Sequence, residues 1–115
     1  MDYKIVATEY FKRQLKRLAK KYHSIANDYE KLLKDLYANP NKGEDLGNNT
    51  RKIRMAIASK NKGKSGGARV ITCNILVDVV NTEIYLLTIY DKNEQGNISE
   101  KEIQNLKATN GLING

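Results

Sequence analysis

The chain has 115 residues, which suits one domain, and a hydrophobic fraction of 40% is enough for a single modest core. Its 20 Lys and Arg against 13 Asp and Glu give a formal net charge of +7. Cys73 is the only cysteine and His23 the only histidine, which excludes a disulfide framework and argues against a zinc hydrolase or a His-based triad. The longest apolar runs, 55–58 and 84–87, are too short to cross a membrane, and with no signal-like start the sequence indicates a cytoplasmic protein.

Positive charge is concentrated in the first part of the chain. Residues 1–66 hold 16 Lys and Arg against 7 Asp and Glu, whereas residues 67–115 hold 4 against 6. Residues 51–69 carry seven cations and no acidic residue. Because solvated surfaces usually mix both signs, this run indicates an anionic partner, and nucleic acid is the commonest one.

The first third of the chain predicts a strand followed by two helices. Residues 4–7 suit a short strand, and Thr8 can cap a helix whose apolar residues recur at helical spacing. Ser24 is expected to cap a second helix, which Asn39-Pro40 ends because proline lacks a backbone N–H. Two helices joined so closely are expected to form an antiparallel hairpin.

Period-two alternation predicts strands in the next part of the chain. Residues 41–50 are polar and rich in turn formers, which predicts a loop. The predicted strands lie at 52–58, 68–80 and 83–91. A flexible basic loop is expected at 59–67 and a turn at Asn81-Thr82. A capping box from Ser99 to Glu102 predicts a short final helix.

This order, β-α-α-β-β-β-α, predicts a single α+β domain over residues 1–115. Its N-terminal strand and helical hairpin would pack on an antiparallel β-sheet meander, beside a short C-terminal helix. Because consecutive strands with short connections pair, the 59–67 loop, Arg69 and Lys92 should meet at one end of the sheet, near Arg54. Such a surface can hold a phosphate backbone. The alternation leaves open which face of the sheet Arg69 takes.

Several other polar residues have ordinary structural interpretations. Cys73 lies in the middle of a strand, which suits a core position. Tyr90 can stack on a base or fill the core. Asp91 and Glu94 are near enough to the cationic end to matter, although each can simply pair with a lysine. The cations of residues 12–21 can form a solvated helix face.

Three segments carry a family likeness: Lys52-Ile53-Arg54-Met55, Gly63 to Ile71, and Ile89-Tyr90-Asp91-Lys92-Asn93-Glu94. With the order of elements, they resemble RelE-superfamily toxins, in particular the HigB-like branch of type II toxin–antitoxin systems. The likeness covers about residues 3–107, and its Lys-Ser-Gly-Gly-Ala-Arg segment is fairly specific to that branch.

The resemblance implies a ribosome-dependent endoribonuclease that cuts mRNA in the decoding site without a cofactor or metal. A cognate antitoxin would hold it inactive, and operator DNA would be bound only through the antitoxin complex. The cationic residues of the family match Lys52, Arg54, Arg69 and Lys92. Arg54 and Arg69 would stabilise the charge that builds on phosphorus, and Lys92 would assist the leaving 5′-oxygen. Lys64 is the loop candidate for a substrate phosphate.

Beyond the three residues given catalytic roles, contacts with RNA are predicted at Lys52, Lys60, Lys62, Lys64 and Tyr90. Some RelE-type proteins carry a tyrosine after the last strand, and the matching position is about Ile98. The general base therefore stays unassigned. The two candidates are a lysine of lowered pKa in the cationic cluster and Glu94.

Three other functions suit parts of the sequence. A ParE-like inhibitor of DNA gyrase has a similar architecture, a non-catalytic nucleic-acid-binding module needs only the basic half, and a toxin that has lost activity is a third alternative. Arg54, Arg69 and Lys92 favour the nuclease, since a gyrase-binding surface has no evident need for such a cluster.

Overall fold

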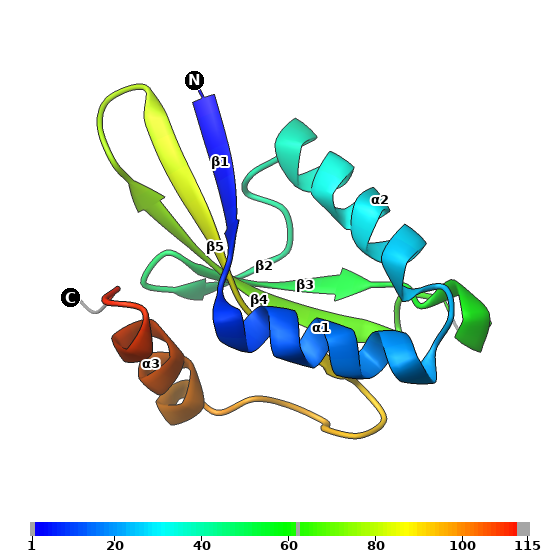
Figure 1. Cartoon of the computed structure of the whole chain (residues 1–115). Coiled ribbons are helices and arrows are strands. Elements are labelled where there is room, and N and C mark those ends of the chain that lie inside the picture. Colours follow the sequence, from blue (N-terminus) through cyan, green and yellow to red (C-terminus); the bar gives the residue numbers. More distant parts are fainter. Residues whose placement is uncertain (1, 62, 113–115) are drawn as a thin grey trace.

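The structure is a computed structural model that describes residues 2–61 and 63–112. Five strands form one sheet: β1 (Asp2–Ala7), β2 (Glu44–Gly47), β3 (Thr50–Met55), β4 (Ala68–Leu76) and β5 (Asn81–Asp91). The helices are α1 (Glu9–Lys21), α2 (Ile25–Ala38), the short 3-10 helix η1 (Ala58–Lys60) and α3 (Glu100–Thr109). The α+β class, with its N-terminal strand, helix pair, sheet and short final helix, is confirmed (Figure 1).

The sheet is mixed, and its order is β1-β5-β4-β3-β2. The three strands of the predicted meander, β3, β4 and β5, pair antiparallel, as expected, but β1 lies parallel to β5. The prediction of a loop at 41–50 was wrong in part, because this segment contains β2, which pairs antiparallel with β3. Asn48 and Asn49 both have positive φ, so this pair forms a tight hairpin turn, as asparagine does more readily than other residues with a side chain.

Two strand boundaries also differ from the predictions. The strand predicted at 68–80 ends at Leu76, and the turn lies at 77–80 because the Asp78 carboxylate accepts hydrogen bonds from the backbone N–H of Val80 and Asn81. Asn81 and Thr82, predicted as the turn, instead begin β5. The strand predicted at 52–58 ends at Met55 and is followed by η1.

The predicted helix starts are largely confirmed. The Thr8 hydroxyl accepts a hydrogen bond from the backbone N–H of Phe11 and donates one to the carbonyl of Leu86, which fixes the start of α1 against β5. The capping box between Ser99 and Glu102 is present at the start of α3. Ser24 occupies the N-cap position of α2 but makes no capping hydrogen bond with its side chain.

The sheet carries a hydrophobic core on each face. α1 and α2 pack on one face over the larger core, in which Phe11, Leu18 and Leu36 are fully buried. α3 packs on the other face over a smaller core formed by Ile71, Cys73, Leu87, Tyr90 and Ile103. Since α3 has only 10 residues, it does not extend over the start of β4 (Figure 1), where Arg69 and Tyr90 are nevertheless buried.

Candidate nucleic-acid interface

Arg54 and Arg69 lie directly opposite each other on neighbouring strands. The register of β3 and β4 pairs Arg54 with Arg69, and that of β4 and β5 pairs Arg69 with Tyr90. Residues paired in this way project from the same face, so the structure puts Arg69 with Ile71 and Cys73 on the face that carries α3. Two like charges opposite each other destabilise an antiparallel pair. Folding alone therefore gives no reason for this pair of arginines.

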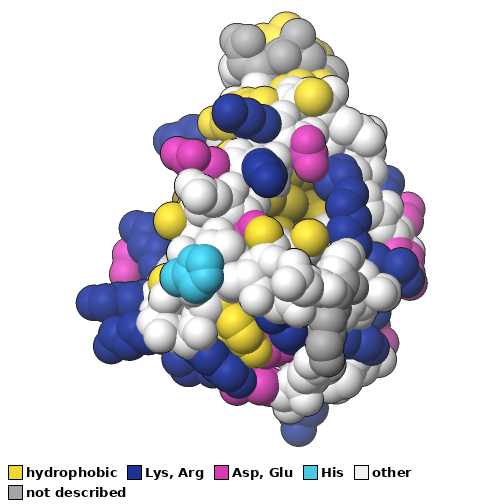
Figure 2. Space-filling model, turned by 90° about the vertical axis from the view of Figure 1, so that its right-hand side faces the viewer, with side chains coloured by type: hydrophobic (Ala, Val, Ile, Leu, Met, Phe, Trp, Pro, Cys, Tyr) yellow, Lys and Arg dark blue, Asp and Glu magenta, His cyan; other side chains and the backbone are white. Residues whose placement is uncertain are grey.

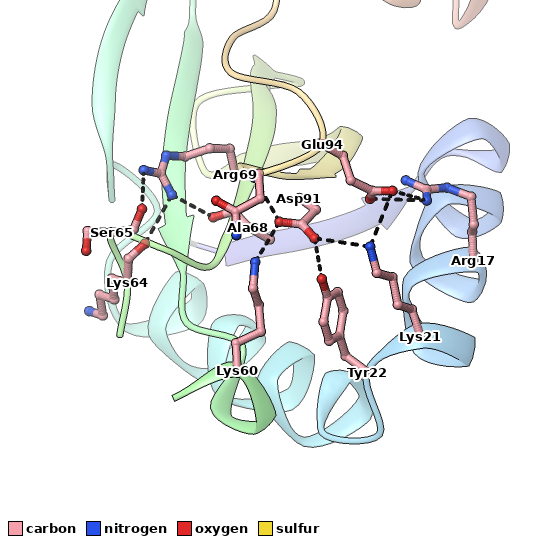
Figure 3. Close-up of polar contacts among 11 residues, drawn as sticks. Arg17, Lys21, Tyr22, Lys60, Lys64, Ser65, Ala68, Arg69, Asp91 and Glu94 are labelled. Carbon is pink, nitrogen blue, oxygen red and sulfur yellow. Dashed lines mark hydrogen bonds and ion pairs between the residues drawn. The ribbon is translucent and has the colours of Figure 1, made fainter. Parts of the chain in front are cut away.

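The Arg69 guanidinium is buried and is held by backbone carbonyls. Arg69 is 6% exposed, its Nη1 donates to the carbonyls of Lys64 and Ala68 at 3.1 and 3.2 Å, and its Nη2 donates to that of Ser65 at 3.2 Å (Figure 3). Among the described residues, no carboxylate lies within 4.0 Å of Arg69 or Arg54. The full positive charge of Arg69 is thus offset only by carbonyl dipoles, which leaves it able to attract an anion.

Gly67 allows the loop that holds Arg69 to pass close to the end of β3. A Cβ atom at Gly67 would lie 2.3 Å from the carbonyl oxygen of Met55, so any larger residue would push the two segments apart. The carbonyl of Gly67 also accepts a hydrogen bond from the backbone N–H of Lys92. The Gly-Gly segment therefore closes the loop against the sheet, and Arg69 follows it after Ala68.

Three lysines complete a cationic cluster, which we define as Lys52, Arg54, Lys64, Arg69 and Lys92. Lys52 and Lys92 both reach the turn after β5, since their ammonium groups donate to Asn97 Oδ1 at 3.2 Å and to the carbonyl of Gly96 at 3.0 Å. Lys64 is exposed and lines a hollow of about 150 Å³ together with Arg54 and residues of α2. The structure thus brings Lys64, Arg69 and Lys92 to one end of the sheet beside Arg54, as the sequence predicts. Lys62 lies outside the described residues.

Lys60 lies apart from this cluster, in a buried network around Asp91. Its ammonium group is 2.8 Å from Asp91 Oδ1, and Tyr22 donates to Asp91 Oδ2 at 2.6 Å (Figure 3). Burial by itself raises the pKa of the Asp91 carboxyl, but hydrogen bonds from Lys60, Tyr22 and the Asn93 N–H outweigh it, so the pKa lies below its ordinary value. Lys60 therefore anchors η1 to the end of β5 and does not point toward the cluster.

Glu94 and Tyr90 are also engaged with the protein itself. The Glu94 carboxylate pairs with Arg17 at 3.3 Å and Lys21 at 3.6 Å, so it faces α1. Tyr90 is 4% exposed and fills the smaller core beside Arg69, where its buried hydroxyl has no hydrogen-bond partner. Burial raises the pKa of Tyr90. Ile98, which the sequence resemblance matches approximately to a tyrosine of some RelE-type proteins, is half-buried and packs on the same core.

Sequence reasoning missed a second anchor of the loop after β3. Asp28 is 4% exposed and accepts hydrogen bonds from the Ser24 hydroxyl at 2.7 Å and the backbone N–H of Ala58 at 3.2 Å. The signal was available, because Asp28 falls on the apolar face of α2 between Ile25 and Leu32. A carboxylate at such a position must find partners inside the protein.

The described residues lack a metal-binding cluster and a membrane-spanning helix. Within residues 2–61 and 63–112, no group of three or more His, Cys, Asp or Glu side chains is placed to hold a metal ion. In the same part of the chain, no helix is long and apolar enough to span a bilayer. Lys and Arg side chains lie on both flanks of the molecule, with fewer acidic side chains among them (Figure 2).

The fold and the cluster define a small basic α+β protein with a group of cations at one end of its sheet. The sequence matches the family described as the RelE toxin of the RelE / RelB toxin–antitoxin system over residues 3–114. The chain therefore belongs to the RelE toxin family. It is the toxin of a toxin–antitoxin pair, and an antitoxin is its partner.

Proposed function

We propose that this toxin is a metal-independent endoribonuclease that cleaves translated mRNA on the ribosome and so inhibits translation. The observation that carries the proposal is the directly opposed pair Arg54 and Arg69, one exposed and one buried, with no carboxylate partner among the described residues. Membership of the RelE family and the HigB-like Lys-Ser-Gly-Gly-Ala-Arg segment support the same activity. This activity implies a cytoplasmic location.

In the proposed reaction, a ribose 2′-oxygen attacks the adjacent phosphorus and the bond to the 5′-oxygen of the next nucleotide breaks. The 2′-proton passes to a base and the leaving 5′-oxygen takes up a proton, so the products are a 2′,3′-cyclic phosphate and a 5′-hydroxyl. Negative charge builds on the phosphoryl oxygens in the transition state, and fixed guanidinium groups stabilise it without reorganising. We assign this role to Arg54 and Arg69, and proton donation to the 5′-oxygen to Lys92.

The remaining cations would bind the RNA. Lys52 and Lys64 flank the arginines, and we assign them to neighbouring phosphates. Lys60 is excluded from this set because its ammonium group is paired with the Asp91 carboxylate, and Tyr90 because its ring packs in the smaller core. Glu94 is an unsuitable general base, since its carboxylate faces α1 and pairs with two cations.

The test is a reconstituted translation reaction on one defined mRNA, with and without ribosomes, in which the new 5′ ends are mapped. We expect cuts in phase with codons that require ribosomes. Arg54→Ala should slow cleavage about 100- to 1,000-fold, the usual effect of removing one transition-state donor. Because Arg54 is exposed, this variant should fold normally. The matched control is Lys34→Ala, which removes an exposed cation from α2.

Two results would overturn the proposal. One is full activity of the Arg54→Ala variant. The other is intact mRNA under both conditions, after which a gyrase supercoiling assay would test the ParE-like alternative. RNA binding without cleavage, weakened but not abolished by Arg69→Lys, would instead indicate a non-catalytic binding module.

A further inference from the structure

The turn of the β4–β5 hairpin exposes an unusual amount of apolar surface. Four of the seven large hydrophobic residues exposed among the described residues fall in the stretch 76–80: Leu76 is 65% exposed, Val77 55%, Val79 86% and Val80 53%. We call these four residues the hairpin tip. The hairpin projects beyond the helices, beside the start of β1 (Figure 1). Contiguous apolar surface of this kind marks a site of interaction with another molecule.

The hairpin tip does not suit the RNA of the proposed reaction. β4 runs from Ala68, next to the cationic cluster, to Leu76, and the eight steps between its nine residues, at about 3.3 Å each, separate the two ends by roughly 26 Å. The one charged residue of the turn, Asp78, uses its carboxylate to close the turn, where it accepts from Val80 and Asn81. Aliphatic side chains offer nothing to a phosphate backbone and the exposed Asp78 carboxylate would repel one, so the partner is a protein.

The surface next to the hairpin tip is also shaped to receive a side chain. A hollow of about 230 Å³ lies beside the hairpin, and its lining combines Leu76, Tyr3, Pro40 and Thr82 with three asparagines, Asn41, Asn49 and Asn74. The half-buried Tyr3 belongs to the larger core, so this hollow has a firm floor. A partner side chain that combines an apolar body with a hydrogen-bonding group can thus be anchored beside the hairpin, as interface anchors usually are.

We propose that the hairpin tip is a docking site for an apolar segment of the antitoxin, at the end of the sheet remote from the cationic cluster. The family match gives this toxin an antitoxin as its partner, and a net charge of +7 on each copy opposes a second copy of this chain. A pair of hairpin tips alone is also small for a stable dimer, which needs about 1,200 Å² of buried surface. The proposal rests on the antitoxin partner and is independent of the nuclease activity.

The test compares antitoxin binding by the native toxin and by a variant with Val77→Thr, Val79→Thr and Val80→Thr. Threonine keeps the β-branched shape, so the turn and its backbone hydrogen bonds should persist. We expect the Kd for the cognate antitoxin, measured by calorimetry, to rise at least tenfold. The matched control is Leu46→Thr, at an exposed aliphatic residue of β2, and its Kd should stay within twofold of the native value.

A second measurement needs no variant. In the native toxin, the methyl NMR signals of the three valines should shift when unlabelled antitoxin is added, whereas the Leu46 methyls should not. The proposal is overturned if these signals and the Kd of the threonine variant are both unchanged. It is also overturned if the free toxin is a dimer in sedimentation that the variant disrupts while antitoxin binding persists. If the threonine variant, assayed without antitoxin, no longer cleaves RNA, the hairpin tip is not independent of the cationic cluster and the proposal fails on that point.

Discussion

Removing the charge of Asp91 is expected to destabilise the fold strongly at neutral pH. The Asp91 side chain is fully buried and the Lys60 side chain is 7% exposed, with 2.8 Å between Oδ1 and Nζ. Asp91→Asn would leave the Lys60 ammonium group buried without its counter-ion, and such a change costs about 3–5 kcal/mol. Because the asparagine carbonyl can still accept from Tyr22, the lower limit applies, and we expect a loss of about 3 kcal/mol.

This loss can be read from thermal or urea unfolding. For 115 residues the entropy of unfolding is about 0.24 kcal/mol/K, so a loss of about 3 kcal/mol lowers Tm by about 12 °C. The matched control is Asp35→Asn, the same change at the exposed pair with Lys42, where the distance is 3.9 Å. That variant should lose at most about 1 kcal/mol. Equal losses in the two variants would refute the role given to the buried pair.

The pH dependence gives an independent check. The folded-state pKa of Asp91 lies below the ordinary 3.8, so its carboxylate stabilises the fold at every pH above about 4. That contribution falls away as the pH drops through the lowered folded-state pKa. The difference in stability between the native protein and Asp91→Asn should therefore shrink below pH 4. A difference that stays constant down to pH 2 would mean that the carboxylate charge is not the cause.

Three further changes have defined outcomes. Gly67→Ala should cost about 1–3 kcal/mol in urea unfolding, because its Cβ would crowd the Met55 carbonyl, and no loss would contradict that close approach. Ser99→Ala removes the cap that Glu102 completes and should cost about 1 kcal/mol, measured by the same method. Lys64→Ala should reduce the slope of log K for single-stranded RNA against log salt by about 0.7, whereas an unchanged slope would place Lys64 outside the RNA interface.

The sequence predicted the parts of the site that follow from strand order and alternation. Ile53 and Met55 are buried and Arg54 is exposed, as a period of two requires. Short connections also brought the loop after β3, Arg69 and Lys92 to one end of the sheet. The sequence could not predict which face of the sheet Arg69 takes. Arg69 is in phase with Ile71 and Cys73, which are buried only because a helix distant in the sequence covers their face.

What the sequence could not provide is the identity of pairs between distant residues. Lys60 and Lys64 look alike in a basic loop, yet one is buried against Asp91 and the other is exposed. The difference depends on a carboxylate 31 residues further along the chain. The parallel position of β1 beside β5 was missed for a related reason. No local pattern identifies the partner of an N-terminal strand, which depends on how the two intervening helices pack.

The loop between β3 and β4 joins the buried network around Asp91 to the cationic cluster. Substitutions that affect this loop are therefore expected to act differently from substitutions outside it. Asp28 fixes the start of this loop at Ala58, Asp91 fixes Lys60, and the Arg69 guanidinium holds the carbonyls of residues 64, 65 and 68. Loosening either carboxylate should therefore cost stability and also displace Arg69 from the position at which it can meet a phosphate. Arg54 lies outside this set of anchors, on the exposed side of β3. A substitution there should remove charge from the cluster while leaving the loop in place, so cleavage should fall without a matching loss of stability.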